Sequence, residues 1–333
     1  MTDRVARVVL NASMELGGLH HISGITGSVA TNYNFFAGTL GLRLVKKTVN
    51  QDDVRAYHLY YADGVGSPGT DVTFFDWPRS PREQRGNNSI SRTGLRVPNA
   101  ASLEFWSARL ASAGAILEPI MELDGRPTLL FDDLEGGRFA LVADGGSFEA
   151  KPWTKTVPLE HAMIGLGPVW LTVPHLEPTA AVLTQVLGMR AEREYVMGGA
   201  GVTVYAMDAG GAGAEVHIET RPDLPPAKSG SGAMHHVAFR VKNIAEYALW
   251  LEHLTQSGIP NSGPIDRHYF KALYFREPNG ILFELSTDDP GFATDENEDQ
   301  LGQRLALPPF LEPRRADIEA QLAPLEFARS DVL

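Results

Sequence analysis

The stretch LRVPNAASLEFWSARLASAG at residues 95–114 matches the stretch FRVKNIAEYALWLEHLTQSG at residues 239–258 without a gap. Each stretch begins at the end of an alternating apolar run, continues with apolar residues near 3.6-residue spacing, and ends at a glycine. The same offset of 144 positions persists further along, pairing Phe131 with Phe275, Gly136 with Gly280, Phe139 with Phe283, and Asp144 with Asp288. Such regular spacing indicates an internal repeat, and therefore a fold built from equivalent modules.

A second repeat links the first and third quarters of the chain. At an offset of 147 positions, Leu40-Gly41 meets Leu187-Gly188, and Arg43 meets Arg190. Together the two repeats predict four related units, which we number modules 1 to 4 in chain order.

Module 4 shows most clearly the pattern that we expect within each module. The alternating stretch at 236–241 predicts a strand, and Asn243 then caps a helix predicted over 244–257, which Gly258 ends. A further strand is predicted within 259–270, and a hairpin around Pro278-Asn279-Gly280 has its strands at 272–276 and 281–286. The predicted order is βαβββ.

A βαβββ unit leaves one apolar sheet face uncovered, so such modules must pair. We therefore predict an α+β fold in which four βαβββ modules pair into two half-open barrels, each with a cup lined by inward-pointing residues. The predicted N-terminal domain spans 16–149 (modules 1 and 2), and the C-terminal domain spans 160–289 (modules 3 and 4). A linker at 145–158 joins them, and a tail at 290–333 is predicted to wrap the surface before a short helix near 315–322.

The overall composition argues against several classes of protein. Of the 333 residues, 43% are hydrophobic and 21% charged, which is typical of a globular protein with a substantial core. The net charge of −12 argues against a nucleic-acid partner, and no apolar run is long enough for a membrane span or a signal-peptide core. The absence of cysteine excludes disulfides and thiolate metal sites. We expect a cytoplasmic protein, and exposed sheet edges favour a homo-oligomer.

The repeat also provides an internal control for residues that could bind a metal or take part in catalysis. His236 and Glu284 of module 4 are replaced by Arg92 and Ala140 at the equivalent positions of module 2. In the same way, module 3 has Pro168 where module 1 has His21. Residues of the types that bind metals therefore occupy these equivalent positions only in modules 1 and 4. A structural role does not explain this asymmetry.

Two imidazoles and one carboxylate are ligands suited to Fe(II) or Mn(II), and they leave coordination positions open. At such positions a catechol or hydroquinone can coordinate through oxygen beside O2. Since spin-paired organic molecules react slowly with O2, the metal would provide the electronic route between the two reactants.

Tyr274 is the first candidate beside the carboxylate. If Gly280 takes the left-handed position of the hairpin loop, cross-strand partners have residue numbers that total 558, and Tyr274 faces Glu284. Such a tyrosine could hydrogen-bond a substrate oxygen or act as acid or base. The competing interpretation is an aromatic core residue.

Other polar positions have simpler interpretations. His20 and His235 precede His21 and His236, and strand alternation turns them to the opposite face unless a bulge redirects them. His58 and His217 are interpreted as ordinary strand residues, whereas the pattern does not decide whether His161 approaches the cup. The Gly-rich stretches at 198–201 and 210–213 predict hairpin loops, and the acidic run at 295–299 predicts a solvated segment.

Three stretches resemble the vicinal oxygen chelate superfamily: Leu19-His20-His21-Ile22, Tyr57-His58-Leu59-Tyr60-Tyr61-Ala62-Asp63 with the following Gly69-Thr70, and Met234-His235-His236. The chain is most similar to its hydroquinone ring-cleaving dioxygenases, which include the chlorohydroquinone 1,2-dioxygenases. The resemblance covers nearly the whole chain, including Gly291-Phe292 and the acidic segment of the tail.

The resemblance implies a ring-cleaving, extradiol-type dioxygenase with mononuclear Fe(II) on His21, His236 and Glu284. It also implies supporting roles beside the metal for the residues that complete the site: His20, His235, Arg267 and Tyr274. In the two-domain catechol-cleaving relatives the metal lies within the C-terminal half. Pro168 excludes that arrangement here, so the site must join module 1 to module 4 and leave modules 2 and 3 as its empty counterpart. His21 and His236 should then approach within about 3–4 Å, as neighbouring ligands of one ion do.

The leading hypothesis is an Fe(II)-dependent dioxygenase that inserts both atoms of O2 into a hydroquinone- or catechol-type aromatic substrate. A second hypothesis is a glyoxalase-like isomerase or lyase that uses Zn(II), Ni(II) or Mn(II) without O2. A third is a metal-free resistance protein that sequesters an aromatic compound. Oxygen consumption separates the first two, and metal analysis separates the third from both.

Overall fold

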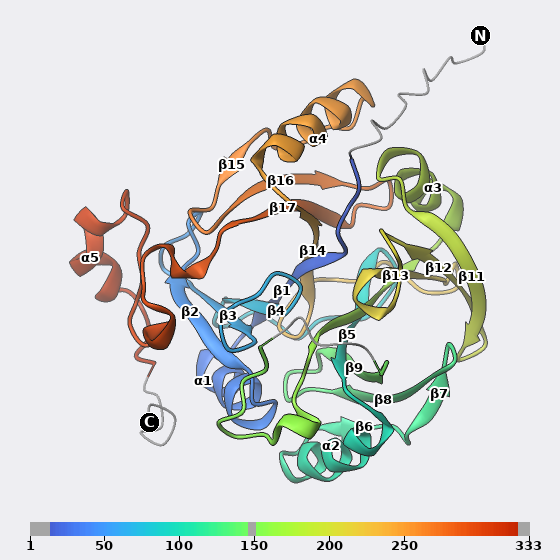
Figure 1. Ribbon diagram of the computed structural model, residues 1–333, viewed down its shortest axis with the longest axis horizontal. Coiled ribbons are helices and arrows are strands. Elements are labelled where there is room, and N and C mark those ends of the chain that lie inside the picture. The colour runs from blue at the N-terminus through green and yellow to red at the C-terminus, as the bar shows by residue number, and fades with distance from the viewer. Residues whose placement is uncertain (1–13, 146–150, 326–333) are drawn as a thin grey trace.

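The predicted repeat is present as strand, helix and further strands in each quarter of the chain (Figure 1). The computed structural model describes residues 14–145 and 151–325. In modules 1 and 3 a short α-helix continues into a π-helical turn, and in module 2 four strands follow the helix.

Module 1 contains β1 (Leu19–Thr26), α1 (Val29–Tyr33), η1 (Asn34–Thr39), β2 (Arg43–Val49), β3 (Tyr57–Ala62) and β4 (Asp71–Asp76). Module 2 contains β5 (Ser89–Val97), α2 (Ala100–Ser112), β6 (Ile116–Leu117), β7 (Met121–Leu123), β8 (Arg126–Asp132) and β9 (Arg138–Ala143). Module 3 contains β10 (Gly165–Val173), α3 (Leu176–Ala181), η3 (Val182–Val186), β11 (Arg190–Met197), β12 (Ala200–Ala206) and β13 (Glu215–Thr220). Module 4 contains β14 (Met234–Val241), α4 (Ile244–Gln256), β15 (Ile265–Asp266), β16 (Phe270–Arg276) and β17 (Leu282–Pro290).

The two long helices begin and pack in the same way. Asn243 accepts hydrogen bonds from the backbone N–H groups of residues 245 and 246 at the start of α4, and Asn99 accepts one from residue 102 at the start of α2. Trp106 and Trp250, which the repeat pairs, are both fully buried under their helices. The repeated sequence therefore encodes a repeated contact between helix and sheet.

Two sheets organise the molecule, and each takes one module from either half of the chain. Modules 1 and 4 form a sheet in the order β15-β16-β17-β14-β1-β4-β3-β2, and modules 2 and 3 form one in the order β11-β12-β13-β10-β5-β9-β8-β6. The antiparallel pair β1–β14 joins the first module to the last, and β5–β10 joins the two middle modules. The candidate site requires this pairing of the first module with the last.

The predicted domains do not coincide with these sheets, because both sheets draw on both predicted domains. The division at 149 and the start of the linker fall partly on 146–150, outside the described residues, and the domain boundaries stay a prediction. After that gap the linker packs on module 1, where the backbone of Lys151 is hydrogen-bonded to Asp63 and Gly64.

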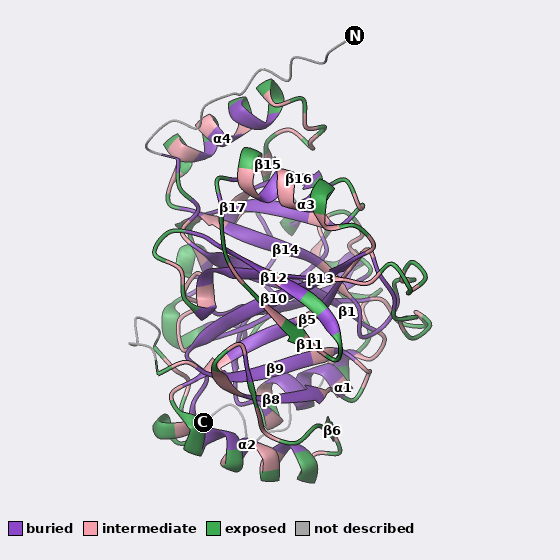
Figure 2. Ribbon diagram, turned by 90° about the vertical axis from the view of Figure 1, so that its right-hand side faces the viewer, coloured by how far each residue is buried: buried purple, intermediate pink, exposed green. Residues whose placement is uncertain are grey.

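Most of the strands form the buried centre of the molecule, whereas β11 is largely exposed and the exposed surfaces of α2 and α4 lie at the two ends (Figure 2). In the part of the chain that the structure describes, no helix is long and apolar enough to cross a membrane.

The tail lies against β2, which would otherwise be a free sheet edge (Figure 1). Leu305 forms a bridge with Lys47, and Leu307, Leu311 and Ile318 pack on Val49. A short helix, α5 (Arg315–Glu319), lies within the predicted range, after the turns η5 (Phe292–Thr294), η6 (Glu298–Gln300) and η7 (Glu312–Arg314).

The prediction of a solvated acidic run at 295–299 is wrong for its first two residues. Asp295 and Glu296 both form ion pairs with Lys46 of β2, whose side chain is fully buried. The Lys46 ammonium also lies 4.8 Å from the centre of the Tyr269 ring. Because a buried ammonium requires counter-charges, this cluster fixes the start of the tail on the sheet of modules 1 and 4.

Candidate metal centre and its pocket

Three buried side chains from neighbouring strands meet in the cup of modules 1 and 4. The His21 and His236 Nε2 atoms lie 3.2 Å apart, and Glu284 Oε2 lies 3.3 Å and 2.9 Å from them respectively. The strand register explains the meeting, because Glu284, Ala238 and His21 form one row across β17, β14 and β1. The small side chain of Ala238 lets its two neighbours in the row approach each other. The expected approach of the two imidazoles within 3–4 Å is therefore present.

Both histidine doublets lie at β-bulges. Between β1 and β14 the register pairs Leu19 with Phe239 and His21 with Ala238, so His20 is an extra residue on β1. It also pairs Ser23 with His236 and Gly24 with Met234, so His235 is an extra residue on β14. A bulge breaks the alternation of side chains. This is the condition under which the first histidine of each doublet could reach the site.

The extra histidines hold the rings that face the centre. His20 Nδ1 lies 2.9 Å from His21 Nδ1, and His235 Nδ1 lies 2.8 Å from His236 Nδ1. His20 Nε2 lies 3.1 Å from the carbonyl oxygen of Thr287, so this nitrogen must donate and His20 Nδ1 must accept. In its neutral form, the form that binds a metal, His21 then carries its proton on Nδ1 and directs Nε2 at the centre.

The three residues fit a divalent cation. Neighbouring ligands about 2.1 Å from a common ion lie about 3 Å apart, which matches the measured separations. Glu284 Oε1 accepts a hydrogen bond from Ser286, whereas Oε2 is buried without a hydrogen bond of regular geometry in the described part of the chain. Burial alone would raise the pKa of Glu284, but the two imidazoles hold it well below its usual value. The centre therefore offers one anionic oxygen and two imidazole nitrogens.

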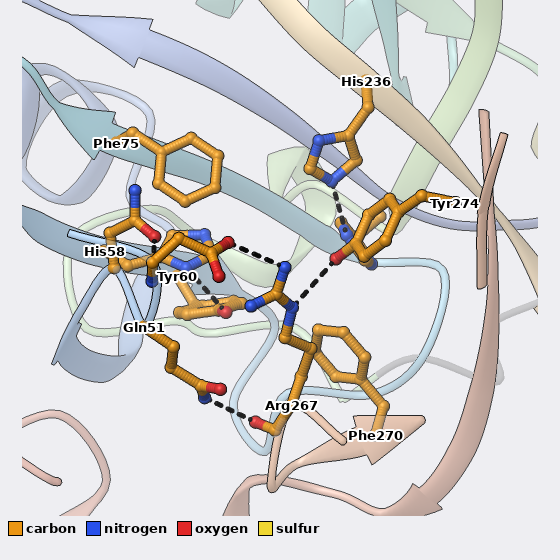
Figure 3. Close-up of a pocket in the computed structure, with 11 residues that line it drawn as sticks. Gln51, His58, Tyr60, Phe75, His236, Arg267, Phe270 and Tyr274 are labelled. Atoms are coloured by element: carbon orange, nitrogen blue, oxygen red, sulfur yellow. Dashed lines mark hydrogen bonds and ion pairs between the residues drawn. The ribbon is translucent and has the colours of Figure 1, made fainter. Parts of the chain in front are cut away.

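A pocket of ≈ 340 Å³ opens onto this centre (Figure 3). Phe75 and Phe270 give it apolar walls, and His21, His236, Tyr274 and Arg267 also line it. This volume counts all the space between the lining residues, including the part that is open to solvent. Aromatic walls with a few polar groups suit a flat ring that carries oxygen atoms.

Tyr274 and Arg267 form a linked pair at one side of the pocket. Tyr274 faces Glu284 across the hairpin, as the loop geometry predicts, and its hydroxyl accepts a 3.2 Å hydrogen bond from Arg267 Nε. Arg267 also donates to Asp52 across a distance of 3.0 Å. Burial and the charge of Glu284 raise the pKa of Tyr274, so the phenol stays protonated. The pair thus presents a neutral O–H and a cation to the pocket.

His58, interpreted from the sequence as an ordinary strand residue, lies on β3 as expected and also lines the pocket. Tyr60 and the loop residues Asn50, Gln51 and Asp52 also line it, and sequence reasoning missed all of them. A signal for two of these was present: His58 and Tyr60 alternate with the core residues Leu59 and Tyr61, so they share the opposite face of β3.

His161 and His217 lie outside this site. The His161 ring stacks on Phe105 of α2, with 4.4 Å between ring centres. His217 lies in the cup of modules 2 and 3 with Asp124 and Glu215, a group whose spacing could suit a cation. Two arginines already neutralise that group, because Arg126 and Arg193 both donate to Glu215. Of the glycine-rich stretches, Gly198 and Gly199 form the predicted turn between β11 and β12, whereas Ala200 and Gly201 already belong to β12. The stretch at 210–213 lies in the connection between β12 and β13 and enters the 3-10 helix η4 (Ala212–Ala214).

Comparisons with known proteins agree with this geometry. A family model described as Glyoxalase/Bleomycin resistance protein/Dioxygenase superfamily matches residues 159–285. The chain is 48% identical over 316 residues to "Putative ring-cleaving dioxygenase MhqA" of Bacillus subtilis (strain 168), which covers 94% of this chain and 100% of that protein. It is 30% identical over 302 residues to the chlorohydroquinone/hydroquinone 1,2-dioxygenase of Sphingobium indicum, which covers 89% of this chain and 92% of that protein.

Solved structures give the same result for the fold. A Bacillus subtilis protein named "putative dioxygenase" superposes with a TM-score of 0.86 at 34% identity, over 94% of this chain and 99% of that one. Glyoxalase I from Zea mays superposes with a TM-score of 0.61 at 14% identity, over 81% of this chain and 92% of that one, which shows the shared fold alone. The resemblance to the vicinal oxygen chelate superfamily and the α+β fold of paired modules are confirmed.

Proposed function

Since the chain belongs to the glyoxalase, bleomycin resistance protein and dioxygenase superfamily, with relatives named as ring-cleaving dioxygenases, we propose that it is an Fe(II)-dependent dioxygenase. Its substrate is a hydroquinone- or catechol-type aromatic, whose ring it cleaves with O2. One observation carries the proposal: the buried group of His21, His236 and Glu284 faces a pocket with aromatic walls. The iron would be held by these three side chains.

When bound, the metal supplies Lewis acidity and the electronic route between an aromatic diol and O2. The side chains that line the pocket orient the reactants and keep water away from them. Phe75 and Phe270 bound the pocket with apolar surface, which holds a flat ring and excludes water. Tyr274 donates a hydrogen bond to the substrate oxygen nearest Glu284, and the Arg267 guanidinium stabilises negative charge that develops on the substrate.

The test is to measure metal and oxygen uptake together. His21→Ala and Glu284→Ala should each lose bound metal on elemental analysis, and lose O2 uptake with hydroquinones and catechols, while the far-UV circular dichroism stays unchanged. His161→Ala is the matched control, because that ring stacks on α2 away from the pocket. Full activity in either site variant would refute the assignment.

The same experiment separates the alternatives. A glyoxalase-like isomerase or lyase, whose fold this chain shares, would retain Zn(II) or Mn(II) and consume no O2. A metal-free binding protein would contain no metal and release no product. The homo-oligomeric state and the cytoplasmic location stay predictions, and sedimentation analysis would measure the first.

A further inference from the structure

His58 and Tyr60 of β3 form a second polar wall of the pocket. In Figure 3 they lie on the other side of Arg267 from His236 and Tyr274. Neither residue has a part in holding the metal or in the Tyr274–Arg267 pair. Both are nevertheless fixed by aromatic contacts, since the His58 ring centre lies 4.1 Å from that of Phe75 and the Tyr60 ring centre lies 5.1 Å from that of Phe292.

A chain of hydrogen bonds runs from the pocket into the sheet. The Tyr60 hydroxyl lies 2.9 Å from His58 Nδ1, and His58 Nε2 lies 2.9 Å from Thr73 Oγ1. Thr73 Oγ1 lies 2.7 Å from the Ser23 hydroxyl. Burial lowers the pKa of His58 well below its ordinary value and raises that of Tyr60, so both groups are neutral.

Each side chain in this series of hydrogen bonds can both donate and accept, so all the hydrogen bonds of the series can point in either direction. When Tyr60 donates to His58, its oxygen keeps a lone pair for a substrate hydroxyl. When His58 donates to Tyr60, the tyrosine O–H is available to a substrate oxygen that has lost its proton. Tyr60 can therefore bind one oxygen atom in either protonation state.

We propose that Tyr60, held in place by His58, binds the substrate oxygen remote from the metal ligands and so selects a 1,4-diol over a ring with one hydroxyl group. The two oxygens of a 1,4-diol point to opposite sides of the ring, and in Figure 3 the metal ligand His236 and Tyr60 lie on opposite sides of Arg267. The two oxygens of a 1,2-diol point to the same side. This inference rests on the proposed function, and it assigns that function to hydroquinones.

Binding to the Zn(II)-loaded protein tests the inference without turnover, because Zn(II) has no redox chemistry. Anaerobic calorimetry would compare hydroquinone, catechol and phenol. Tyr60→Phe should weaken hydroquinone binding about three- to tenfold, the effect of one hydrogen bond, and change phenol binding less than about twofold. Tyr61→Phe is the matched control, because its hydroxyl is buried in the core and has no hydrogen-bond partner in the described residues.

The role of His58 has its own readout. His58→Leu should reduce the preference for hydroquinone over phenol, and adding it to Tyr60→Phe should produce little further loss, because both changes remove one interaction. Equal weakening of hydroquinone and phenol in Tyr60→Phe would overturn the inference, as would a wild-type protein that binds the two equally. Failure of the proposed function is a separate result: the wild-type protein with Fe(II) would then consume no O2 whatever its binding preference.

Discussion

Replacing His20 with Phe tests the proposed role of this residue in holding His21 for the metal. The His20 ring is buried, its Nδ1 accepts from His21 Nδ1, and its Nε2 donates to the Thr287 carbonyl. Phe has a similar volume and keeps the ring contact with Phe270, whose centre lies 5.5 Å away. The substitution therefore removes two hydrogen bonds while largely preserving the packing.

The expected losses follow from those two bonds. The Thr287 carbonyl and the His21 Nδ1–H each lose a buried partner, at about 1–3 kcal/mol per group, so the free energy of unfolding of the metal-free protein should fall by about 2–6 kcal/mol. Without an acceptor on Nδ1, His21 no longer favours the tautomer that leaves Nε2 free. The affinity for Fe(II) should fall about 10- to 100-fold, as for other partners of metal-binding histidines.

Anaerobic competition with a chromophoric chelator would measure the affinity, and urea unfolding would measure the stability. His235→Phe is the matched comparison, because its Nδ1 contacts His236 in the same way while its Nε2 contacts no carbonyl in the described chain. That variant should lose as much metal affinity and less stability. Unchanged Fe(II) affinity in His20→Phe would refute the assignment of the tautomer.

Three further results are expected. Lys46→Met should lower the free energy of unfolding by up to about 3–5 kcal/mol, because it leaves Glu296 buried with only the exposed Arg304, 3.5 Å away, as a counter-charge, and a urea midpoint equal to that of the wild type would contradict this. Tyr274→Phe should retain the metal but reduce kcat for O2 uptake about 100-fold, because it removes a fixed donor to the substrate, and an undiminished kcat would exclude that role. The metal-free protein should lose stability below about pH 6.5, because burial lowers the pKa of His20 and His235 to about 3 and only the unfolded chain then takes up those protons. Urea unfolding from about pH 7 to about pH 5 measures this loss, and constant stability over that range would count against it.

The part of the fold that the sequence predicts well is the part that local pattern determines. The repeat paired Trp106 with Trp250, the pattern of module 4 predicted Asn243 as a helix cap, and the hairpin loop predicted that Tyr274 faces Glu284. The missing histidine of module 3 also indicated the pairing of module 1 with module 4. Each inference used residues whose relation is set by spacing along a strand, helix or turn.

The features that the sequence did not predict depend on contacts between distant segments of the chain. Nothing near Asp295 and Glu296 in the sequence indicates that Lys46, about 250 positions earlier, lies buried beside them. His58 also resembles any strand histidine until β3 is seen to form a pocket wall. The sequence indicates that His20 and His235 could reach the site only if bulges redirect them, but it does not predict the bulges. A bulge depends on how both strands of the pair are aligned.

Because the first module pairs with the last, binding of the proposed metal would affect the stability of the whole protein. His21 and Glu284 stand 263 positions apart, so any ion that they share connects the two ends of the chain. A ligand that binds only the native state adds to its stability, by about 2.7 kcal/mol when its concentration is 100 times its dissociation constant. If the proposed iron occupies this site, iron starvation should therefore shorten the lifetime of the protein in a cell as well as reduce its activity, because proteases act on molecules that open.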